Sequence, residues 1–295
     1  MSSPNRNHFD PERLADVGCK PEWLRFVHPA LATDDKYSRG VVGLVTGSEA
    51  YPGAAVLGVT AAIRFGVGLV RLVAADAVAA IVLAARPEVV RAEIDADAAD
   101  LPRCNAWVVG SGVAADATSE AAWLNRVLAS DVPVVLDAGA LEVGSLEAFA
   151  GRRILTPHTG EAVRLLARFG VESTRADIEQ DAVGVAQQLA NLSGAIVLLK
   201  GNRTVVAAPD GVFWRAEAAP SELATAGTGD VLAGVLGAIL ATNPGEDLFE
   251  LAQFGVWLHS RAAAELAASG PIAALDLADQ LRHVVGRLTN GGADE

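Results

Sequence analysis

The sequence of 295 residues predicts an α/β fold, with a mainly parallel central sheet and helices on both of its faces. Short runs of β-branched and other apolar residues alternate along the chain with Ala- and Leu-rich stretches that have helical spacing. Strands that are apolar on both faces are typical of parallel sheets covered by helices. Neither a linker nor an internal repeat interrupts the alternation. We therefore predict one domain over residues 29–295, preceded by a polar lead-in at residues 1–28.

The predicted strands are short. In chain order they are Val41–Val45, Leu69–Val73, Trp107–Val109, Val132–Leu136, Arg153–Leu155, Ala195–Leu199 and Thr204–Ala207. Helical spacing predicts helices at Ala54–Phe65, Glu161–Phe169 and Asp177–Leu192, and over most of the chain from Asp230 onward. The Pro209-Asp210-Gly211 turn predicts a hairpin whose second strand is Val212–Arg215, and so one antiparallel pair late in the chain.

The composition excludes several classes of protein. A hydrophobic fraction of 51% excludes disorder, and 36 acidic against 23 basic residues, a net charge of −13, argue against a nucleic-acid partner. Two cysteines cannot build a disulfide framework, and no Cys/His cluster suggests a metal cage. The longest apolar run, Val231 to Ala241, is about half of the roughly 20 residues that span a bilayer. Because Asn5, Arg6 and His8 replace the apolar core of a signal peptide, we expect a soluble cytoplasmic protein without a membrane partner.

Glycine and polar residues directly follow five of the predicted strands. They are Gly47-Ser48, Gly110-Ser111-Gly112, Asp137, Thr156-Pro157-His158 and Lys200-Gly201. Each is also ordinary in a loop after a strand. Because the carboxyl ends of parallel strands meet at one edge of a sheet, where ligands bind, the five together favour a ligand site.

The segment Thr225–Asp230 is the sharpest single signal. Its glycines expose backbone N–H groups and the apolar helix that follows adds positive potential, which suits a phosphate or an oxyanion. Asp230 at that helix start could accept a proton from a hydroxyl beside the anion, although it could also be a simple helix cap. No GxxxxGK[ST] motif occurs, and Gly66-Val67-Gly68 precedes a strand, so neither a Walker-type site nor a dinucleotide fingerprint is indicated.

Three other residues have both a functional and a structural interpretation. Lys200 is one of only three lysines and could offer a point charge to a phosphate, or could be a solvated strand end. His158 could hydrogen-bond a ligand or merely fill its loop. Glu161 could act in the site or serve as a first-turn helix acid.

At these motifs the chain resembles the ribokinase-like superfamily and, within it, the family of ADP- or ATP-dependent NAD(P)H-hydrate dehydratases. The similar stretches are Lys36–Gly40, Thr46–Ser48, Tyr51–Ala55, Arg64–Val70, Val109–Gly112, Leu136–Leu141, Leu155–Glu161, Leu198–Gly201 and Ala224–Gly234. The resemblance implies a three-layer sandwich and the repair of hydrated nicotinamide cofactors. ADP or ATP, with Mg²⁺, would phosphorylate the hydroxyl of the S epimer of hydrated NADH or NADPH (NADHX or NADPHX), and elimination of phosphate would restore NAD(P)H.

The resemblance also implies roles for particular residues. Asp230 would take the hydroxyl proton, and the amides from Gly227 to Gly229 would stabilise the transferring phosphoryl group. The residues that would contact the hydrated cofactor are Ala54, Gly112, His158 and Asp230. Those that would contact the adenine nucleotide are Lys200, Gly201, Asn202, Arg203, Thr204 and Gly229. Asp137 and Glu161 could join a network of Mg²⁺-bound water, and no direct protein ligand of the metal is predicted.

The resemblance has two local departures and leaves two alternatives. The family usually has Pro at the place of Ser111 and an Asn-Pro pair at the place of Pro220-Ser221, and the second change could alter nucleotide choice or activity. A homo-oligomer, a tetramer, is expected, with a separate NAD(P)H-hydrate epimerase as functional partner. The alternatives are a ribokinase-like kinase of a vitamin precursor or sugar hydroxyl, and a non-catalytic nucleotide-binding relative.

Overall fold

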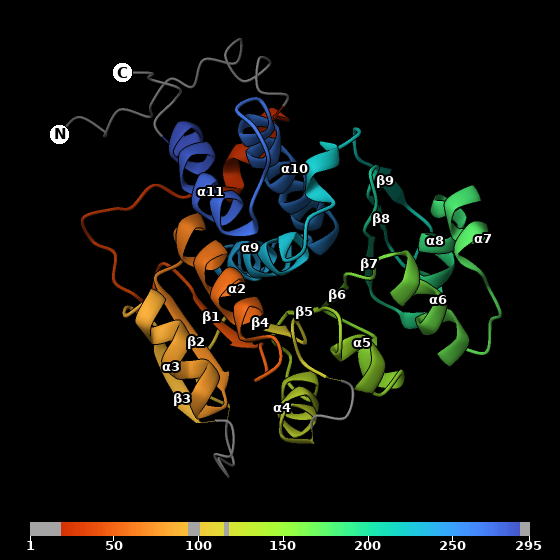
Figure 1. Ribbon diagram of the computed structural model, residues 1–295, viewed down its shortest axis with the longest axis horizontal. Helices are drawn as coiled ribbons and strands as arrows, with labels where there is room; N and C mark the ends of the chain where they lie inside the picture. The colour runs from red at the N-terminus through yellow and green to blue at the C-terminus, as the bar shows by residue number, and fades with distance from the viewer. Residues whose placement is uncertain (1–18, 94–100, 115–117, 290–295) are drawn as a thin grey trace.

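A computed structural model describes residues 19–93, 101–114 and 118–289. Within these ranges nine strands form one sheet, in the order β3-β2-β1-β4-β5-β6-β7-β8-β9 (Figure 1). The strands are β1 (Val41–Val45), β2 (Leu69–Ala74), β3 (Val90–Glu93), β4 (Ala106–Val109), β5 (Val134–Leu136), β6 (Arg153–Leu155), β7 (Ile196–Leu199), β8 (Val205–Ala207) and β9 (Phe213–Arg215).

The pairing of the strands confirms the mainly parallel sheet. Every neighbouring pair from β3 to β7 is parallel, and β7-β8 and β8-β9 are antiparallel, as the Pro209-Asp210-Gly211 turn predicts. Strand β3, at the edge of the sheet, was not predicted. Strand β5 starts two residues later than predicted, because Pro133 has no N–H to join a ladder.

Helices cover both faces of the sheet, so the predicted three layers are present (Figure 1). The α-helices are α2 (Pro52–Phe65), α3 (Asp76–Ala85), α4 (Thr118–Leu128), α5 (Ala140–Val143), α6 (Thr159–Arg168), α7 (Arg175–Gln180), α8 (Ala182–Ser193), α9 (Thr228–Thr242), α10 (Leu248–Ala267) and α11 (Ala274–Thr289). Three 3₁₀ turns are also described: η1 (Pro21–Phe26), η2 (Glu147–Phe149) and η3 (Ser221–Leu223). Every helix in the described ranges falls short of the length or the hydropathy of a membrane span.

Strand β4 shows why the sheet needs both helical layers. Ala106 and Val108 belong to the apolar cluster that includes α2, α9, α10 and α11, whereas Trp107 and Val109 belong to the cluster of α4, α5, α6 and α8. Because successive side chains point to opposite faces, a strand of four apolar residues is buried only if both faces are covered. Gly43 on β1 makes room for the Trp107 ring, since a Cβ there would lie 2.3 Å from the indole.

Two segments refine the sequence-based picture. The predicted helix Asp177–Leu192 is two helices, α7 and α8, which meet at Asp181; its carboxylate accepts a hydrogen bond from Gly184 N at 2.8 Å and so caps α8. In the described part of the predicted lead-in, the rings of Trp23 and Phe26 are buried against Phe254 of α10. Residues 1–18 of that lead-in lie outside the described residues.

Candidate active site

The loops after β4 and β5 interlock at the carboxyl edge of the sheet. Gly110 has a φ of +109°, and a Cβ there would lie 2.0 Å from the carbonyl oxygen of Asp137. A Cβ on Gly139 would lie 2.2 Å from the carbonyl oxygen of Val113. Between Asp137 and Gly139, Ala138 adopts φ +45°, a conformation that costs a non-glycine residue about 1–3 kcal/mol. This crowded junction fixes the position of Asp137.

Asp137 is a buried carboxylate whose oxygens are satisfied by three side chains. Ser111 Oγ donates to Oδ2 at 2.8 Å, and Thr156 Oγ1 and Lys200 Nζ donate to Oδ1 at 2.7 and 2.8 Å. Burial alone would raise the pKa of Asp137, but the Lys200 charge and these hydrogen bonds outweigh it and lower the pKa. Asp137 is therefore ionised. The serine at position 111 supplies a hydroxyl donor that the family's usual proline lacks.

Lys200 brings a second carboxylate into the same cluster. Its Nζ lies 3.7 Å from Glu161 Oε2, and its backbone N–H donates to the carbonyl of Pro157 at 2.8 Å. Burial would lower the pKa of Lys200, but Asp137 and Glu161 outweigh this effect and raise it. The residue is therefore a cation held between two carboxylates, and its interpretation as a solvated strand end is wrong.

His158 and Glu161 form a reciprocal cap at the start of α6. His158 Nδ1 accepts hydrogen bonds from Gly160 N at 2.9 Å and Glu161 N at 3.2 Å, and Glu161 Oε2 accepts from His158 N at 2.8 Å. Burial is the main cause that lowers the pKa of His158. With Nδ1 an acceptor, the neutral ring carries its proton on Nε2, which lies 3.4 Å from Glu161 Oε1. The structural interpretation of both residues is thus correct, and 51% of the His158 side chain remains exposed.

The start of α9 has the geometry of an anion site. Gly227 adopts φ +91°, and a side chain there would strike Leu57 at 2.6 Å. The N–H groups of Gly229 and Asp230 have no hydrogen-bond partner among the described residues, as expected for the first turn of a helix. A Cβ on Gly229 would lie 3.6 Å from Lys200 Nζ. Free N–H groups, a helix N-terminus and a cation therefore meet at one point.

Asp230 combines this position with a perturbed carboxyl group. Burial, followed by the negative charge of Asp137, raises the pKa of Asp230 to about 6, against the opposing effect of Lys200. Its carboxyl group has no hydrogen-bond partner among the described residues. A carboxylate with a pKa near neutrality is an effective proton acceptor, so the arrangement suits general-base chemistry beside an anion.

Ala54, in the first turn of α2, and Gly112, in the loop after β4, lie against each other. Gly112 adopts φ +68°, and a Cβ there would lie 2.5 Å from the Ala54 Cβ. One turn along α2 from Ala54, a Cβ on Gly58 would lie 3.5 Å from the Asp230 carbonyl oxygen. Close packing of α2 on α9, through Gly58 and Gly234, therefore connects this pair to the turn that carries Asp230.

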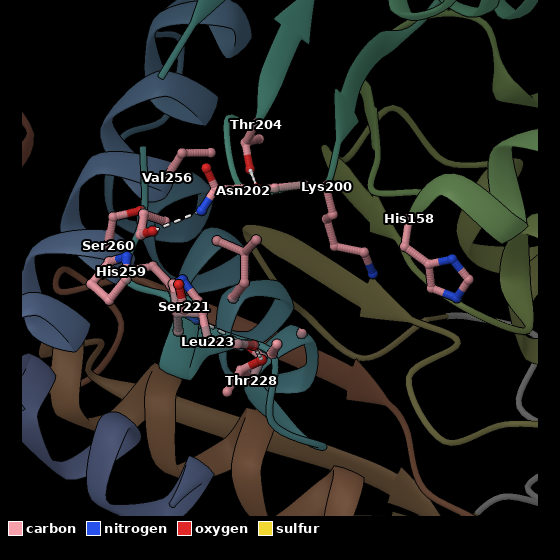
Figure 2. Close-up of a pocket in the computed structure, with 16 residues that line it drawn as sticks. His158, Lys200, Asn202, Thr204, Ser221, Leu223, Thr228, Val256, His259 and Ser260 are labelled. Carbon is pink, nitrogen blue, oxygen red and sulfur yellow. Dashed lines mark hydrogen bonds between the residues drawn. The ribbon is translucent and has the colours of Figure 1, made fainter. Parts of the chain in front are cut away.

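A cavity of about 560 Å³ opens beside the cluster (Figure 2). Six of the predicted site residues line it: His158, Lys200, Gly201, Asn202, Thr204 and Gly229. The other predicted site residues, namely Ala54, Gly112, Asp137, Glu161, Arg203, Gly227 and Asp230, are not in its lining. The side chain of Arg203 instead lies 3.9 Å from that of Glu217, and both are exposed.

Part of this cavity was not predicted as a site. Val256, His259 and Ser260 of α10 line it and were not expected there, whereas Pro220 and Ser221, which also line it, were expected to affect nucleotide choice or activity. The available signal was a His-Ser pair inside the apolar helical run near the C-terminus, which sequence reasoning alone would assign to packing. Among the described residues, no group of three or more His, Cys, Asp or Glu side chains is arranged to hold a metal ion.

Comparison with known proteins identifies similar chains. Residues 42–283 match the sequence model of the family described as NAD(P)H-hydrate dehydratase. An ADP-dependent (S)-NAD(P)H-hydrate dehydratase of Neisseria meningitidis is 38% identical, over 88% of each chain. The bifunctional NAD(P)H-hydrate repair enzyme of Mycobacterium tuberculosis is 44% identical over 71% of this chain, which spans only 42% of that relative's length.

Solved structures agree with the sequence matches. An ADP/ATP-dependent NAD(P)H-hydrate dehydratase from Bacillus subtilis, co-crystallised with ATP and Mg²⁺, has a TM-score of 0.77 and 30% identity, with 91% of this chain and 97% of that chain covered. A ribokinase-like superfamily protein from Enterococcus faecalis has a TM-score of 0.77 at 22% identity, covering 92% and 95%, and supports the fold. The predicted ribokinase-like three-layer fold is confirmed.

Proposed function

The chain belongs to the NAD(P)H-hydrate dehydratase family, and we propose that it uses ADP or ATP to dehydrate the S epimer of NADHX or NADPHX to NAD(P)H. The observation that carries the proposal is the meeting of Lys200, the free N–H groups of Gly229 and Asp230, and the Asp230 carboxyl group at one helix start. These are an anion site and a base in direct proximity, which phosphorylation of a hydroxyl requires.

In the first half-reaction the substrate hydroxyl oxygen attacks the terminal phosphorus of the nucleotide, and the bridging P–O bond breaks. The hydroxyl proton passes to the Asp230 carboxylate, while the first-turn amides of α9 stabilise the charge on the transferring phosphoryl oxygens. Lys200 has three N–H donors, of which Asp137 takes one at 2.8 Å, so donors remain for a phosphate. Asp137 and Glu161 would hold Lys200 in position, and the charge of Asp137 also raises the pKa of Asp230.

In the second half-reaction phosphate leaves with the electron pair of the ring carbon–oxygen bond. The lone pair of the ring nitrogen compensates the departing pair, and loss of a proton from the neighbouring carbon restores the dihydronicotinamide. Ala54, Gly112 and His158 would hold the hydrated ring. The packing of Ala54 against Gly112, and of α2 against the Asp230 turn, supports a single binding surface.

The residues present fit Mg²⁺ held mainly through phosphate and water. The oxygens of Asp137 already accept three hydrogen bonds, and Glu161 Oε2 accepts the His158 N–H. Glu161 Oε1, 3.4 Å from His158 Nε2, is the oxygen of this carboxylate that would accept from a metal-bound water. Mg²⁺ keeps several waters when it binds nucleotide phosphates, and it would neutralise phosphate charge there.

Three further properties are part of the proposal. An epimerase acting on the same hydrated cofactor would be the functional partner, since the dehydration uses one epimer. The protein would act in the cytoplasm. It would assemble as a homotetramer, which light scattering coupled to gel filtration measures directly; a monomeric mass would contradict this.

The test of the proposal is incubation of purified protein with Mg²⁺, separated epimers of NADHX, and ADP or ATP. The expected result is loss of the S epimer with equal formation of NADH and phosphate. Accumulation of a stable phosphorylated product from another alcohol would favour the kinase alternative. Nucleotide binding without turnover of any such substrate would favour the non-catalytic one.

A further inference from the structure

His259 of α10 is a buried histidine on the wall of the cavity (Figure 2). The residue is 6% exposed, and its Nε2 lies 2.9 Å from the carbonyl oxygen of Thr228, the first residue of α9. Thr228 is fixed in turn by its own hydroxyl, which donates to the Leu223 and Thr225 carbonyls at 2.9 and 3.0 Å. His259 therefore holds the same turn that presents the free N–H groups of the anion site.

This hydrogen bond determines which nitrogen of the ring carries the proton. A carbonyl oxygen can only accept, so Nε2 must donate. Burial lowers the pKa of His259 to about 4, against the hydrogen bond to Thr228, which favours the charged form, so the ring is neutral near pH 7. Nδ1 is then an acceptor, and it has no partner among the described residues. This nitrogen is not one of the fully buried unpaired atoms of the described residues, so it is available to a donor on a molecule bound in the cavity.

The rest of the cavity indicates what kind of ligand that is. One part, Lys200 and Gly229, is suited to phosphate. The remaining lining includes six apolar residues, namely Ala219, Pro220, Leu223, Ala224, Leu232 and Val256. An apolar wall with a few placed polar groups is typical of a site for a flat heterocycle, so the nucleoside of a phosphate-bound nucleotide suits this region.

We propose that Nδ1 of His259 accepts a hydrogen bond from an N–H or O–H donor on the nucleoside of the bound nucleotide, which makes His259 a specificity-determining residue. The donor is the 6-amino group of adenine or a ribose hydroxyl. The proposal rests on the nucleotide site proposed above and adds to it a residue that selects among nucleotides.

The first arm of the test measures binding to the unchanged protein by calorimetry, with Mg²⁺ and without hydrated cofactor. The ligands are ADP, IDP, which has a carbonyl in place of the 6-amino group, and the 2′-deoxy and 3′-deoxy forms of ADP. We expect one analogue to bind roughly 5- to 100-fold more weakly than ADP, because it leaves Nδ1 unpaired or facing another acceptor. The analogue with the weaker binding identifies which group of the nucleoside is the donor. Equal binding of all four, or no binding of ADP, overturns the proposal.

The second arm pairs two variants that each keep one side of the imidazole. In His259→Gln the amide N–H replaces Nε2 and no acceptor stands at the position of Nδ1. In His259→Asn the amide oxygen replaces Nδ1 and the donor to Thr228 is lost. We expect the Gln variant to bind ADP and the discriminated analogue within twofold of each other, and the Asn variant to retain the discrimination. His283→Gln on the exposed side of α11 is the matched control and should behave as the unchanged protein.

A purely structural role gives a different result. It would weaken ADP and all three analogues by the same factor in both variants, and that outcome overturns the proposal. The analogue series on the unchanged protein stands even if a variant misfolds. Failure of the proposed function remains distinguishable from failure of this inference. Discrimination among the analogues without NADHX turnover would contradict only the dehydratase activity. NADHX turnover with equal binding of all analogues would contradict only the role of His259.

Discussion

Replacing Asp230 by Asn should abolish turnover and at the same time stabilise the protein. Asp230 is a half-buried carboxyl group with no hydrogen-bond partner among the described residues, beside the buried charge of Asp137. Its ionised form is therefore costly, and asparagine has nearly the same shape without that charge. The proton acceptor of the proposed reaction is lost in the same change, so kcat should fall about 10²- to 10⁴-fold.

The stability gain follows from the pKa. The difference between the ordinary value of 3.8 and about 6 corresponds to about 3 kcal/mol for a fully shielded group. Because Asp230 is partly exposed, we expect the stability gained by Asp230→Asn to be ~1–3 kcal/mol. Because the pKa of Asp230 is raised in the folded state, its ionisation lowers the free energy of unfolding. This loss of stability is absent at pH values below 3.8, grows between 3.8 and about 6, and is complete above about 6.

Urea unfolding of both proteins at pH 8 and pH 5 measures this effect, with NADHX turnover and ADP binding measured on the same samples. Asp230→Asn should be more stable than the unchanged protein at pH 8, by roughly 2–8 °C in a parallel thermal scan, and the gap should narrow at pH 5. ADP affinity should persist, since the first-turn amides remain. A variant that retains more than a tenth of the activity, or gains no stability at pH 8, would refute the reasoning.

Three other substitutions test the rest of the site. Lys200→Met leaves the buried Asp137 carboxylate without its cation and should cost about 3–5 kcal/mol in urea unfolding, together with most of the ADP affinity; unchanged stability would contradict the ion pair. Gly112→Ala places a Cβ 2.5 Å from that of Ala54 at φ +68°, so KM for NADHX should rise and stability should fall by about 1–3 kcal/mol, and a fully active enzyme would argue against this surface. His158→Ala removes a helix cap and should cost about 1 kcal/mol by thermal unfolding, whereas His158→Asn keeps the acceptor and should cost less; equal losses would exclude the cap.

The sequence predicted the sheet well because its strands are buried on both faces and read as uniform apolar runs. The exception, β3, lies at the edge, where Val90–Glu93 alternates apolar with charged residues over only four positions. The break between α7 and α8 was also missed. Helical spacing continues through Asp181, and only the carboxylate acting as a cap, a local hydrogen bond, shows that a new helix starts there.

The site was predicted as an edge of the sheet, but its charge pattern was not. Asp137 and Lys200 are 63 positions apart, and their 2.8 Å contact depends on the register of three strands. The sequence therefore suggested two separate weak candidates where the structure has one ion pair. His259 was also missed, although it lies only 31 positions from Thr228 in the glycine motif. Its role depends on how α10 packs on α9, which no local pattern encodes.

The most direct measurement of the central claim is a stoichiometry. Purified protein is given the S epimer of NADHX with Mg²⁺ and limiting ADP, and AMP, phosphate and NADH are quantified over time. The account predicts that the three products form in equal amounts and that Asp230→Asn forms none of them at a comparable rate. Formation of AMP without NADH, or of NADH without consumption of nucleotide, would contradict it.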